Sequence, residues 1–406
     1  MNKSRCAAAL AVLSVSLVAQ SKIIVVDAQN RAGTDFRDLP AAVAAAKNGD
    51  RLHVRAGSYT GFVTDKGIAV LGEPGSRINA VVRTGTAVRI ANLGKNRSFR
   101  LSGFLLARST SIIHAPRGVL FIAEDCRGSV HLERVVGQLG PTLERVPAAR
   151  IARCDEATLA QCKFRGNPAV DVKLATFFAT GTECIGTHGL AGHGEVDAGA
   201  GIRAERTHGV LSRCFVVGGN LILGISPRVR PQPGITSLSS TWTITGESGT
   251  SIRGGTGSPP ASAIDGTGTV TLDPVVRLIP AKGAPPVGAG ITLKRAGIPS
   301  LRALGAPLKG TVRLEILSRP KDIAVLFAGV LGPRIRLAGV GDLWLDPRRS
   351  FFVAAGTTDR AGRFGLGLRV PGDLGLFGAR ISWQGFAGTL LRGLRLSNPA
   401  SYVHDQ

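Results

Sequence analysis

The chain of 406 residues is poor in aromatic side chains, which make up 5% of it, and contains a single methionine. Acidic residues are also scarce: 27 Asp and Glu stand against 50 Lys and Arg, a formal net charge of +23. No two aspartates are adjacent, no Cys-x-x-Cys pair occurs, and no run of eighteen apolar residues follows the first twenty residues. These absences argue against a structural zinc site and against a transmembrane helix in the rest of the chain.

The first twenty residues contain the longest apolar run. Lys3 and Arg5 precede an apolar stretch over residues 6–18, and small or polar residues follow it. This pattern is typical of a secretory signal peptide, so we expect residues 1–20 to be removed, leaving no transmembrane span after cleavage. The sequence therefore predicts a secreted or cell-surface protein, with a retained N-terminal anchor as the alternative.

The surplus of positive charge is scattered along the chain. There is no Lys/Arg run with interleaved aromatics and no recognisable RNA- or DNA-binding motif, so no nucleic acid is expected as a partner. A chain of this charge attracts polyanions. An anionic polysaccharide or cell-surface glycan is the partner that we expect, and a diffuse basic surface with no specific partner is the alternative.

Glycine is abundant, with 54 residues, and so many glycines imply frequent tight turns between short strands. Residues 38–49 are different and predict a short helix. Asp38 is a favourable N-cap, Pro40 fits the first turn, and Gly49 can take the left-handed C-terminal position. A strand is predicted directly after this helix, over residues 51–55.

The helix and the strands after it carry a resemblance to a known family. The matching residues are Ala45, Ala46, Gly49, Asp50, Leu52, Val54, Gly57, Tyr59, Ile68, Val70, Leu71 and Gly72. In this pattern the segment resembles the N-terminal rung of right-handed parallel β-helix proteins of the pectate-lyase-like superfamily, where a capping helix ends in a Gly-Asp turn. The resemblance implies that fold. It implies no single chemistry, because the superfamily includes lyases, hydrolases, epimerases and proteins without known activity.

An internal repeat points to the same fold. Residues 122–137 align without a gap on residues 151–166: both begin with Ile-Ala, carry apolar residues at the ninth and fourteenth places, and end in Gly. Repeats of this kind are typical of the coils of a solenoid, so we predict a parallel β-helix over residues 22–280. The alignment stacks three apolar pairs on neighbouring coils: Ile122 on Ile151, Val130 on Leu159, and Val135 on Phe164.

Composition changes at residues 279–290, a linker-like stretch of Pro, Gly and Ala. Beyond it, short apolar runs alternate with turns that contain Gly, Pro and Asp, which predicts a small antiparallel β-sandwich over residues 291–406. The expected fold class is therefore all-β: a right-handed parallel β-helix with an N-terminal capping helix, followed by this β-sandwich.

The tripeptide Gly192-His193-Gly194 matches a short motif found around the active site of polygalacturonases. In that family the histidine works beside aspartates from Asn-x-Asp and Asp-Asp motifs, and this chain has no Asp-Asp pair. His193 is therefore a catalytic candidate without its usual partners. A metal site built from His188, His193, Glu195 and Asp197 is the alternative to a solvated loop.

Pectate lyases hold Ca²⁺ with carboxylates from neighbouring coils and remove a proton with Arg or Lys. The acids on the two aligned repeats are Glu124, Asp125, Asp155 and Glu156. The alignment sets two pairs of opposite charge on neighbouring coils: Glu124 on Arg153, and Arg127 on Glu156. This leaves Asp125 and Asp155 as candidate catalytic or Ca²⁺-binding residues. Ca²⁺ is expected only if the chain is a lyase, and no other cofactor is expected.

Five cysteines follow the predicted signal peptide: Cys126, Cys154, Cys162, Cys184 and Cys214. An exported protein permits disulfides, and an odd number leaves at least one thiol free or paired between chains. Cys126 and Cys154 are one residue out of register on the aligned repeats, close enough for a disulfide. Cys162 and Cys214 both stand four residues before a glycine, which is typical of stacked, buried thiols.

The function that these features favour is an exported β-helix scaffold or glycan-binding protein without catalysis. The alternative is a polysaccharide lyase or related carbohydrate-active enzyme acting on an acidic glycan. Carboxylates that converge on one face of the helix would favour the enzyme.

Overall fold

The computed structural model describes residues 21–81, 84–108, 118–139, 146–189, 197–221, 229–246, 249–304, 308–372, 376–389 and 393–404. The predicted signal peptide over residues 1–20 lies outside the described residues and stays a prediction. The described part contains one helix, α2 (Leu39–Ala45), and its other regular elements are strands. No helix within it is long and apolar enough to cross a membrane.

The predicted helix is present, and its N-terminus is fixed by the residue expected to cap it. The Asp38 side chain accepts hydrogen bonds from the backbone N–H of Leu39 and of Thr60, each at 2.8 Å. Pro40 stands in the first turn, and Gly49 takes a left-handed φ of 92° before the chain enters the next strand. The helix is thus held to the strand that contains Thr60, as well as capped locally.

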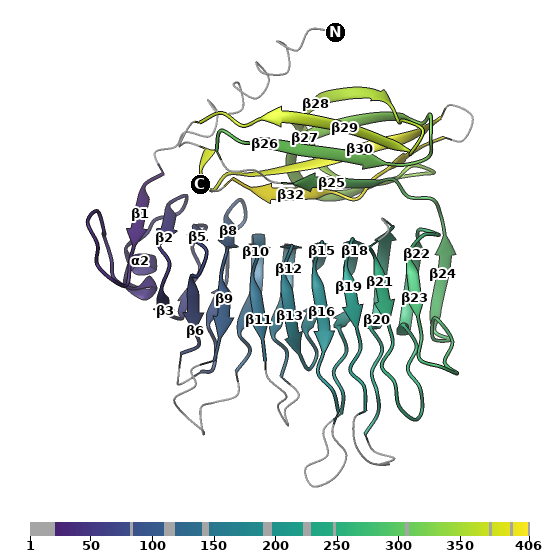
Figure 1. Cartoon of the computed structure of the whole chain (residues 1–406), viewed down its shortest axis with the longest axis horizontal. Helices are drawn as coiled ribbons and strands as arrows, with labels where there is room; N and C mark the ends of the chain where they lie inside the picture. The colour runs from purple at the N-terminus through teal and green to yellow at the C-terminus, as the bar shows by residue number, and fades with distance from the viewer. Residues whose placement is uncertain are drawn as a thin grey trace.

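Most strands belong to two parallel sheets (Figure 1). Sheet I has 15 strands: β1 (Ile23–Val26), β2 (Arg51–Val54), β4 (Phe62–Thr64), β5 (Ala69–Gly72), β7 (Val88–Ala91), β8 (Ser98–Ser102), β10 (Phe121–Glu133), β12 (Ala149–Ala160), β14 (Val170–Lys173), β15 (Thr176–Thr180), β17 (Ile202–Glu205), β18 (His208–Ser212), β20 (Ile235–Thr245), β22 (Ile264–Leu272) and β24 (Ile291–Arg295). Sheet II has nine strands: β3 (Ser58–Thr60), β6 (Arg77–Asn79), β9 (Leu105–Ala107), β11 (Val136–Gln138), β13 (Lys163–Gly166), β16 (Glu183–Gly186), β19 (Phe215–Val217), β21 (Ser251–Arg253) and β23 (Arg277–Ile279). The prediction of an all-β chain with parallel strands is confirmed.

Sheet I is divided lengthwise into two strips. The strands β12, β14, β17, β20, β18 and β15 form a closed circuit of pairings, because the long strands β12 and β20 each pair with two shorter strands. The first strip holds β4, β7, β14 and β17 with the first halves of β10, β12, β20 and β22. The second strip holds β1, β2, β5, β8, β15, β18 and β24 with their second halves.

The chain turns between strips at corners where a residue takes a left-handed backbone conformation. The first corner, between the two strips of sheet I, comprises Asn92, Asp125, Arg153, Leu174, Arg206 and Ser239, with φ between 47° and 58°. The second corner, between the second strip and sheet II, comprises Gly103, Arg134, Gln161, Gly181 and Arg213, with φ from 51° to 81°. Most of these residues lack the freedom of glycine, so the stacking around them has to compensate a local strain.

The stacked pairs differ from those predicted. Ala123, not Ile122, lies opposite Ile151; Leu132, not Val130, lies opposite Leu159; and Gly137, not Val135, lies opposite Phe164. The register of β10 against β12 shifts between Cys126 and Ser129, where β10 carries one more residue than its partner. The gapless alignment is one residue out of register before this bulge, and the extra residue makes it two residues out after the bulge.

The last part of the described chain forms two antiparallel sheets, called here the C-terminal sheets. One contains β25 (Ser300–Leu304), β26 (Thr311–Leu317) and β29 (Arg363–Arg369). The other contains β27 (Ile323–Leu337), β28 (Gly341–Thr357), β30 (Arg380–Thr389), β31 (Gly393–Leu396) and β32 (Ala400–Val403). Both contribute to one hydrophobic core, for example Leu314 and Ile316 from the first and Leu326 and Trp383 from the second. The parallel sheet reaches beyond the predicted boundary near residue 280, since β24 still pairs with β22.

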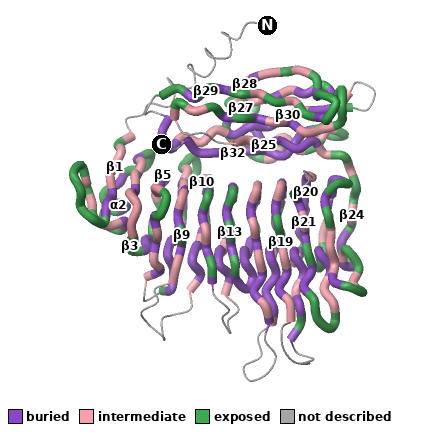
Figure 2. The backbone as a smooth tube through the Cα atoms, viewed as in Figure 1, coloured by how far each residue is buried: buried purple, intermediate pink, exposed green. Residues whose placement is uncertain are grey.

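The C-terminal sheets lie along the row of parallel strands, from the region of β1 and β2 to that of β22 and β24 (Figure 1). Buried residues lie along the parallel strands and also along β25 and β32 of the C-terminal sheets (Figure 2). On the second strip, Phe177 points into the interior, and its neighbour Phe178 is buried at the boundary together with Val210 and Trp344. Both faces of the second strip are therefore covered.

Candidate functional site

The candidate acid Asp125 is paired with an arginine on the next strand. Arg153 Nε and Nη2 donate to the two carboxylate oxygens of Asp125 at 2.5 and 2.8 Å. Both residues belong to the first corner, where their side chains point outward, and the guanidinium group lowers the pKa of Asp125 below its usual range. Asp125 is thus a stably ionised partner in a salt bridge, which is unsuited to proton transfer near neutral pH.

The charge pairs predicted around it are wrong. Glu124 accepts a hydrogen bond from Arg89 Nε at 2.8 Å instead of pairing with Arg153. Glu156 pairs with Arg380 of the C-terminal sheets at 2.6 Å instead of with Arg127. The predicted register is one residue out at Glu124 and two residues out at Glu156, and the prediction could not include a partner from so far along the chain as Arg380.

Asp155, the other acid candidate, is exposed on β12. Within the described ranges no group of three or more His, Cys, Asp or Glu side chains could hold a metal ion, so the structure does not bring Asp125 and Asp155 into such a group. Because Ca²⁺ takes six to eight oxygen ligands, a single exposed carboxylate beside a salt bridge is a poor starting point for a site.

Other carboxylates on the parallel strands are also paired with Arg or Lys on a neighbouring strand. Asp171 on β14 is buried and accepts two hydrogen bonds from Arg203 at 2.8 and 2.9 Å, with Arg150 at 3.7 Å on its other side. Lys173 pairs with Glu205 at 3.2 Å, and Lys163 with Glu183 at 3.4 Å. These pairs run from strand to strand and stabilise the stacking of neighbouring passes, where one pass is one turn of the chain through the parallel strips.

The structure describes only two of the four candidate metal ligands in the glycine-rich segment, His188 and Asp197. His193 and Glu195 lie outside the described residues. His188 Nδ1 accepts a hydrogen bond from the backbone N–H of Asn220 at 3.2 Å, and burial lowers the pKa of its imidazole. The backbone carbonyl of Asp197 accepts a hydrogen bond from the Asn167 side chain at 2.8 Å. His188 therefore joins two passes of the chain as a neutral acceptor.

All five cysteines are buried free thiols. Cys126 and Cys154 lie directly opposite each other, in register rather than one residue apart. Four cysteines come immediately after a corner residue: Cys126, Cys154, Cys162 and Cys214. At the equivalent position of other coils the chain carries Thr182, Thr207 and Ser240. Each of these seven side chains lies within hydrogen-bonding distance of a backbone carbonyl near the corner. Burial raises the pKa of Cys162 to about 12 and that of Cys214 to about 11, which indicates a structural role, not a nucleophilic one.

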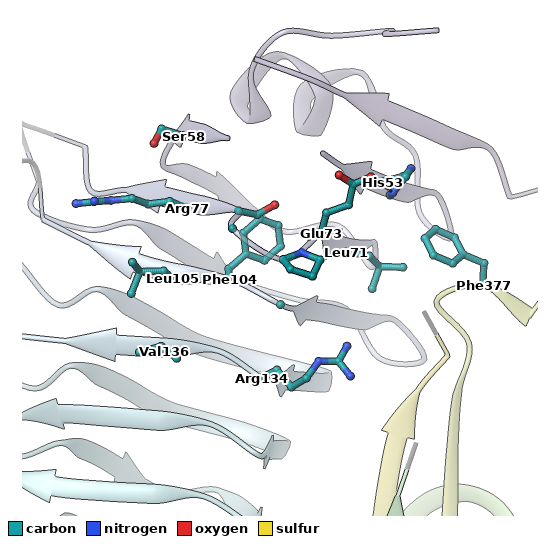
Figure 3. Close-up of a pocket in the computed structure, with 15 residues that line it drawn as sticks. His53, Ser58, Leu71, Glu73, Arg77, Phe104, Leu105, Arg134, Val136 and Phe377 are labelled. Carbon is teal, nitrogen blue, oxygen red and sulfur yellow. Dashed lines mark ion pairs between the residues drawn. The ribbon is translucent and has the colours of Figure 1, made fainter. Parts of the chain in front are cut away.

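A groove opens beside the second corner, at the N-terminal end of the parallel sheets, and has a volume of about 990 Å³ (Figure 3). Its wall follows the turn after β5 and the starts of β6, β9 and β11, and Phe377, in the loop before β30, closes one side. Leu105, which is 40% exposed, and Val136 provide apolar surface. The groove thus combines residues from the two parts of the chain.

The charged groups of the groove are an acid–histidine pair and two arginines. His53 Nε2 lies 3.2 Å from Glu73 Oε1. Arg134, at the second corner, is exposed (Figure 3); its Nη2 donates to Ser102 Oγ at 3.0 Å, and its Nη1 lies 3.4 Å from Glu133 Oε1. Arg77 extends along β6 with its Nε bonded to Asn79. Such a site can bind an anionic group at Arg134 and present hydrogen-bonding groups beside apolar surface.

The groove was missed in the sequence because no local motif marks it. One signal for the covering sheets was present: in Thr176–Thr180 the neighbours Phe177 and Phe178 are both large and apolar. Adjacent residues of a strand point to opposite faces, so this pair indicates a strand that is covered on both faces.

No family model matches the chain, and no curated protein matches it. Among solved structures, the chain is similar to the enzymatically active domain of tailspike protein 2 of bacteriophage CBA120. The identity is 9% over 83% of this chain and 68% of that chain, with a TM-score of 0.32. A likeness at this level says nothing about what this chain binds or does.

Proposed function

We propose that this chain is an exported scaffold protein that binds an acidic polysaccharide without cleaving it. In this proposal the parallel strands from β1 to β24 are a right-handed parallel β-helix capped by the helix at its N-terminus, and the antiparallel strands from β25 onward are a β-sandwich. Three strips of parallel strands with recurring corners, and two antiparallel sheets around one core, support this description. Glycan at the cell surface or in the medium is the proposed partner.

The pairing of carboxylates on the parallel strands is the observation that carries the proposal. Glycan cleavage by a pair of acids needs two carboxyl groups with different protonation, and a Ca²⁺-dependent lyase needs several carboxylates around one ion. Here Glu124, Asp125, Glu156 and Asp171 are each engaged by arginine. These acids are used in ion pairs within the fold, while the surplus of Lys and Arg leaves a positive surface for a polyanion.

The groove beside the second corner is the proposed binding place. A carboxylate-bearing sugar can pair with the exposed guanidinium group of Arg134, and its ring can lie on the apolar surface of Leu105 and Val136. His53 and Glu73 offer hydrogen bonds at the other side.

The experiment is a titration of the chain with oligogalacturonate at low and at physiological ionic strength, with a neutral glucan of equal length as the control ligand. We expect weak binding of the acidic glycan that falls with salt, and none of the neutral one. Arg134→Asn should weaken binding more than Arg206→Asn does. Both are exposed arginines in the left-handed conformation, but only Arg134 lines the groove.

Cleavage is assayed on the same samples by the absorbance of unsaturated uronate and by the release of reducing ends, with and without Ca²⁺. We expect neither signal. Robust turnover that is lost in His193→Ala, or in Asp125→Ala combined with Asp155→Ala, would replace the scaffold by a polysaccharide lyase or a related enzyme. Equal binding of the acidic and the neutral glycan would contradict the proposed partner.

A further inference from the structure

The C-terminal sheets are held to the second strip by polar contacts that are almost closed off from water. Arg380 at the start of β30 has a side chain that is 7% exposed, and it pairs with Glu156 at 2.6 Å. Its Nη2 also donates to Thr158 Oγ1 at 3.1 Å. Nearby, the backbone N–H of Val403 donates to Glu133 Oε2 at 2.7 Å. These contacts join residues more than two hundred positions apart in the sequence.

Two apolar clusters flank these polar contacts. Towards the N-terminal strands, Phe377 and Val403 pack on Ala69 and Leu71. Towards the C-terminal strands, Trp344 meets Phe178 edge-on, with ring centroids 4.9 Å apart. The contact therefore extends along the second strip, with its ion pair between two hydrophobic ends.

The N-terminal cluster also builds the groove. Phe377 meets the imidazole of His53 edge-on, with ring centroids 5.8 Å apart, and His53 in turn pairs with Glu73 (Figure 3). Removal of Phe377 would open one side of the groove and leave the imidazole without its packing partner. The parallel sheets alone would thus present an incomplete groove.

The approach of the loop at Phe377 depends on Gly378. This residue has a left-handed φ of 72°, and a Cβ atom on it would lie 3.1 Å from Leu71 Cδ1. Its carbonyl accepts a hydrogen bond from Arg100 on β8, and its N–H donates to the carbonyl of His404 at 2.6 Å. The loop is therefore fitted closely to the second strip, and a side chain at this position would be strained by the left-handed φ and would crowd Leu71.

We propose that the groove is a composite binding site, complete only while the C-terminal sheets are docked, and that Arg380 is a positioning residue for it through its ion pair with Glu156. This inference rests on the proposed function, since its readout is binding of an acidic glycan. Arg380 does not line the groove, so it acts through the position of Phe377. An enclosed ion pair suits this role, because breaking one partner leaves a charge without compensation.

The test compares four proteins for affinity to oligogalacturonate: wild type, Arg380→Glu, the charge swap Arg380→Glu with Glu156→Arg, and Arg349→Glu. Arg349 is exposed on β28, so its variant has the same change of net charge away from the contact. Arg380→Glu should weaken binding at least about tenfold, and the swap should recover most of this loss. Arg349→Glu should change the affinity by less than about threefold. Small-angle X-ray scattering follows the docking as the radius of gyration.

If Arg380→Glu has the same affinity as Arg349→Glu, the composite site is wrong, whatever the scattering shows. If wild type itself does not bind the acidic glycan, the proposed function fails first and the inference fails with it. Should Arg380→Glu not fold, Gly378→Ala takes its place: loss of affinity in a folded protein supports the inference, and full affinity overturns it.

Discussion

Trp242 on β20 lies directly opposite Gly209 on β18, so close that a Cβ atom on residue 209 would be 2.1 Å from Trp242 Cζ3. The indole is fully buried and meets Phe177 edge-on, with ring centroids 6.5 Å apart. Gly209→Ala should lower the free energy of unfolding by about 1–3 kcal/mol, because a close-packed core resists the shift. Urea unfolding measures it. Gly249→Ala, with no atom within 4 Å of its new Cβ, is the control, and equal losses in both variants would refute the packing argument.

Leu174 at the first corner has a left-handed φ of 50° and is 49% exposed. Asparagine tolerates this conformation better than leucine, so Leu174→Asn should raise the free energy of unfolding by about 0.5–1 kcal/mol. Leu238 is 43% exposed and is not among the left-handed residues. Leu238→Asn should therefore bring no gain, and a similar rise in both variants would show that lost apolar exposure, not backbone strain, is responsible.

Asp171 and Asp125 each accept two hydrogen bonds from one arginine, but they differ in burial. Asp171 is 1% exposed and lies between Arg150 and Arg203, whereas the Asp125 side chain is 43% exposed. Asp171→Asn should cost about 1.5–3 kcal/mol of unfolding free energy, and Asp125→Asn clearly less than that, because solvent screens the exposed pair. Denaturant titration of both variants distinguishes them. The reverse order would mean that the exposed corner pair contributes more to stacking than the enclosed one.

His131 on the second strip is completely buried and is faced by Glu133 and Arg134 from its own stretch of chain, Arg100 from β8 and Arg380 from β30. Burial, together with the guanidinium charges, lowers the pKa of the imidazole well below its usual range. Above about pH 6.5 the histidine is neutral in both the folded and the unfolded chain. As the pH falls further, the unfolded chain takes up a proton that the folded chain resists, and stability is lost.

His131→Gln should therefore reduce the loss of unfolding free energy between neutral and mildly acidic pH. Glu133 affects the pH dependence of stability in the opposite direction. Burial raises the pKa of its carboxyl group, so its contribution to stability is lost as the pH rises through its pKa in the folded chain. The difference between variant and wild type at each pH separates the histidine from this background. An unchanged pH profile in the variant would contradict a buried neutral imidazole.

Cys126 and Cys154, which are free thiols in the structure, should form a disulfide under oxidising conditions. They are in-register partners on neighbouring strands, whose spacing of about 4.8 Å is within the Cα distance of about 7 Å that a disulfide permits. Mass spectrometry of unreduced peptides tests this, with Cys162 as an internal control because Thr182 follows it on the next pass. Both cysteines recovered as free thiols would reject the bond.

The sequence was sufficient where the cause was local. Asp38, Pro40 and Gly49 predicted the helix because capping and turn preferences act within a few residues. The predicted register of β10 against β12 was wrong by one residue before the bulge between Cys126 and Ser129 and by two residues after it, because similar apolar residues recur on both strands and conceal such shifts.

The charge pairs around the candidate acids could not be predicted for a different reason. The charges of Glu156 and Glu133 are met by groups at positions 380 and 403, and neither periodicity nor spacing connects such distant segments. The pair Phe177 and Phe178 indicated that something covers the second strip, but it could not say which segment.

The C-terminal sheets also affect the cooperativity with which the whole chain should unfold. In a repeat protein where each pass contacts only its neighbours, the terminal passes can unfold first and unfolding then proceeds one pass at a time. Here the C-terminal part of the chain contacts Leu71 on β5 and Val210 on β18. Loosening an end therefore strains contacts at the far end, so the chain should melt in a single cooperative transition instead of unravelling gradually.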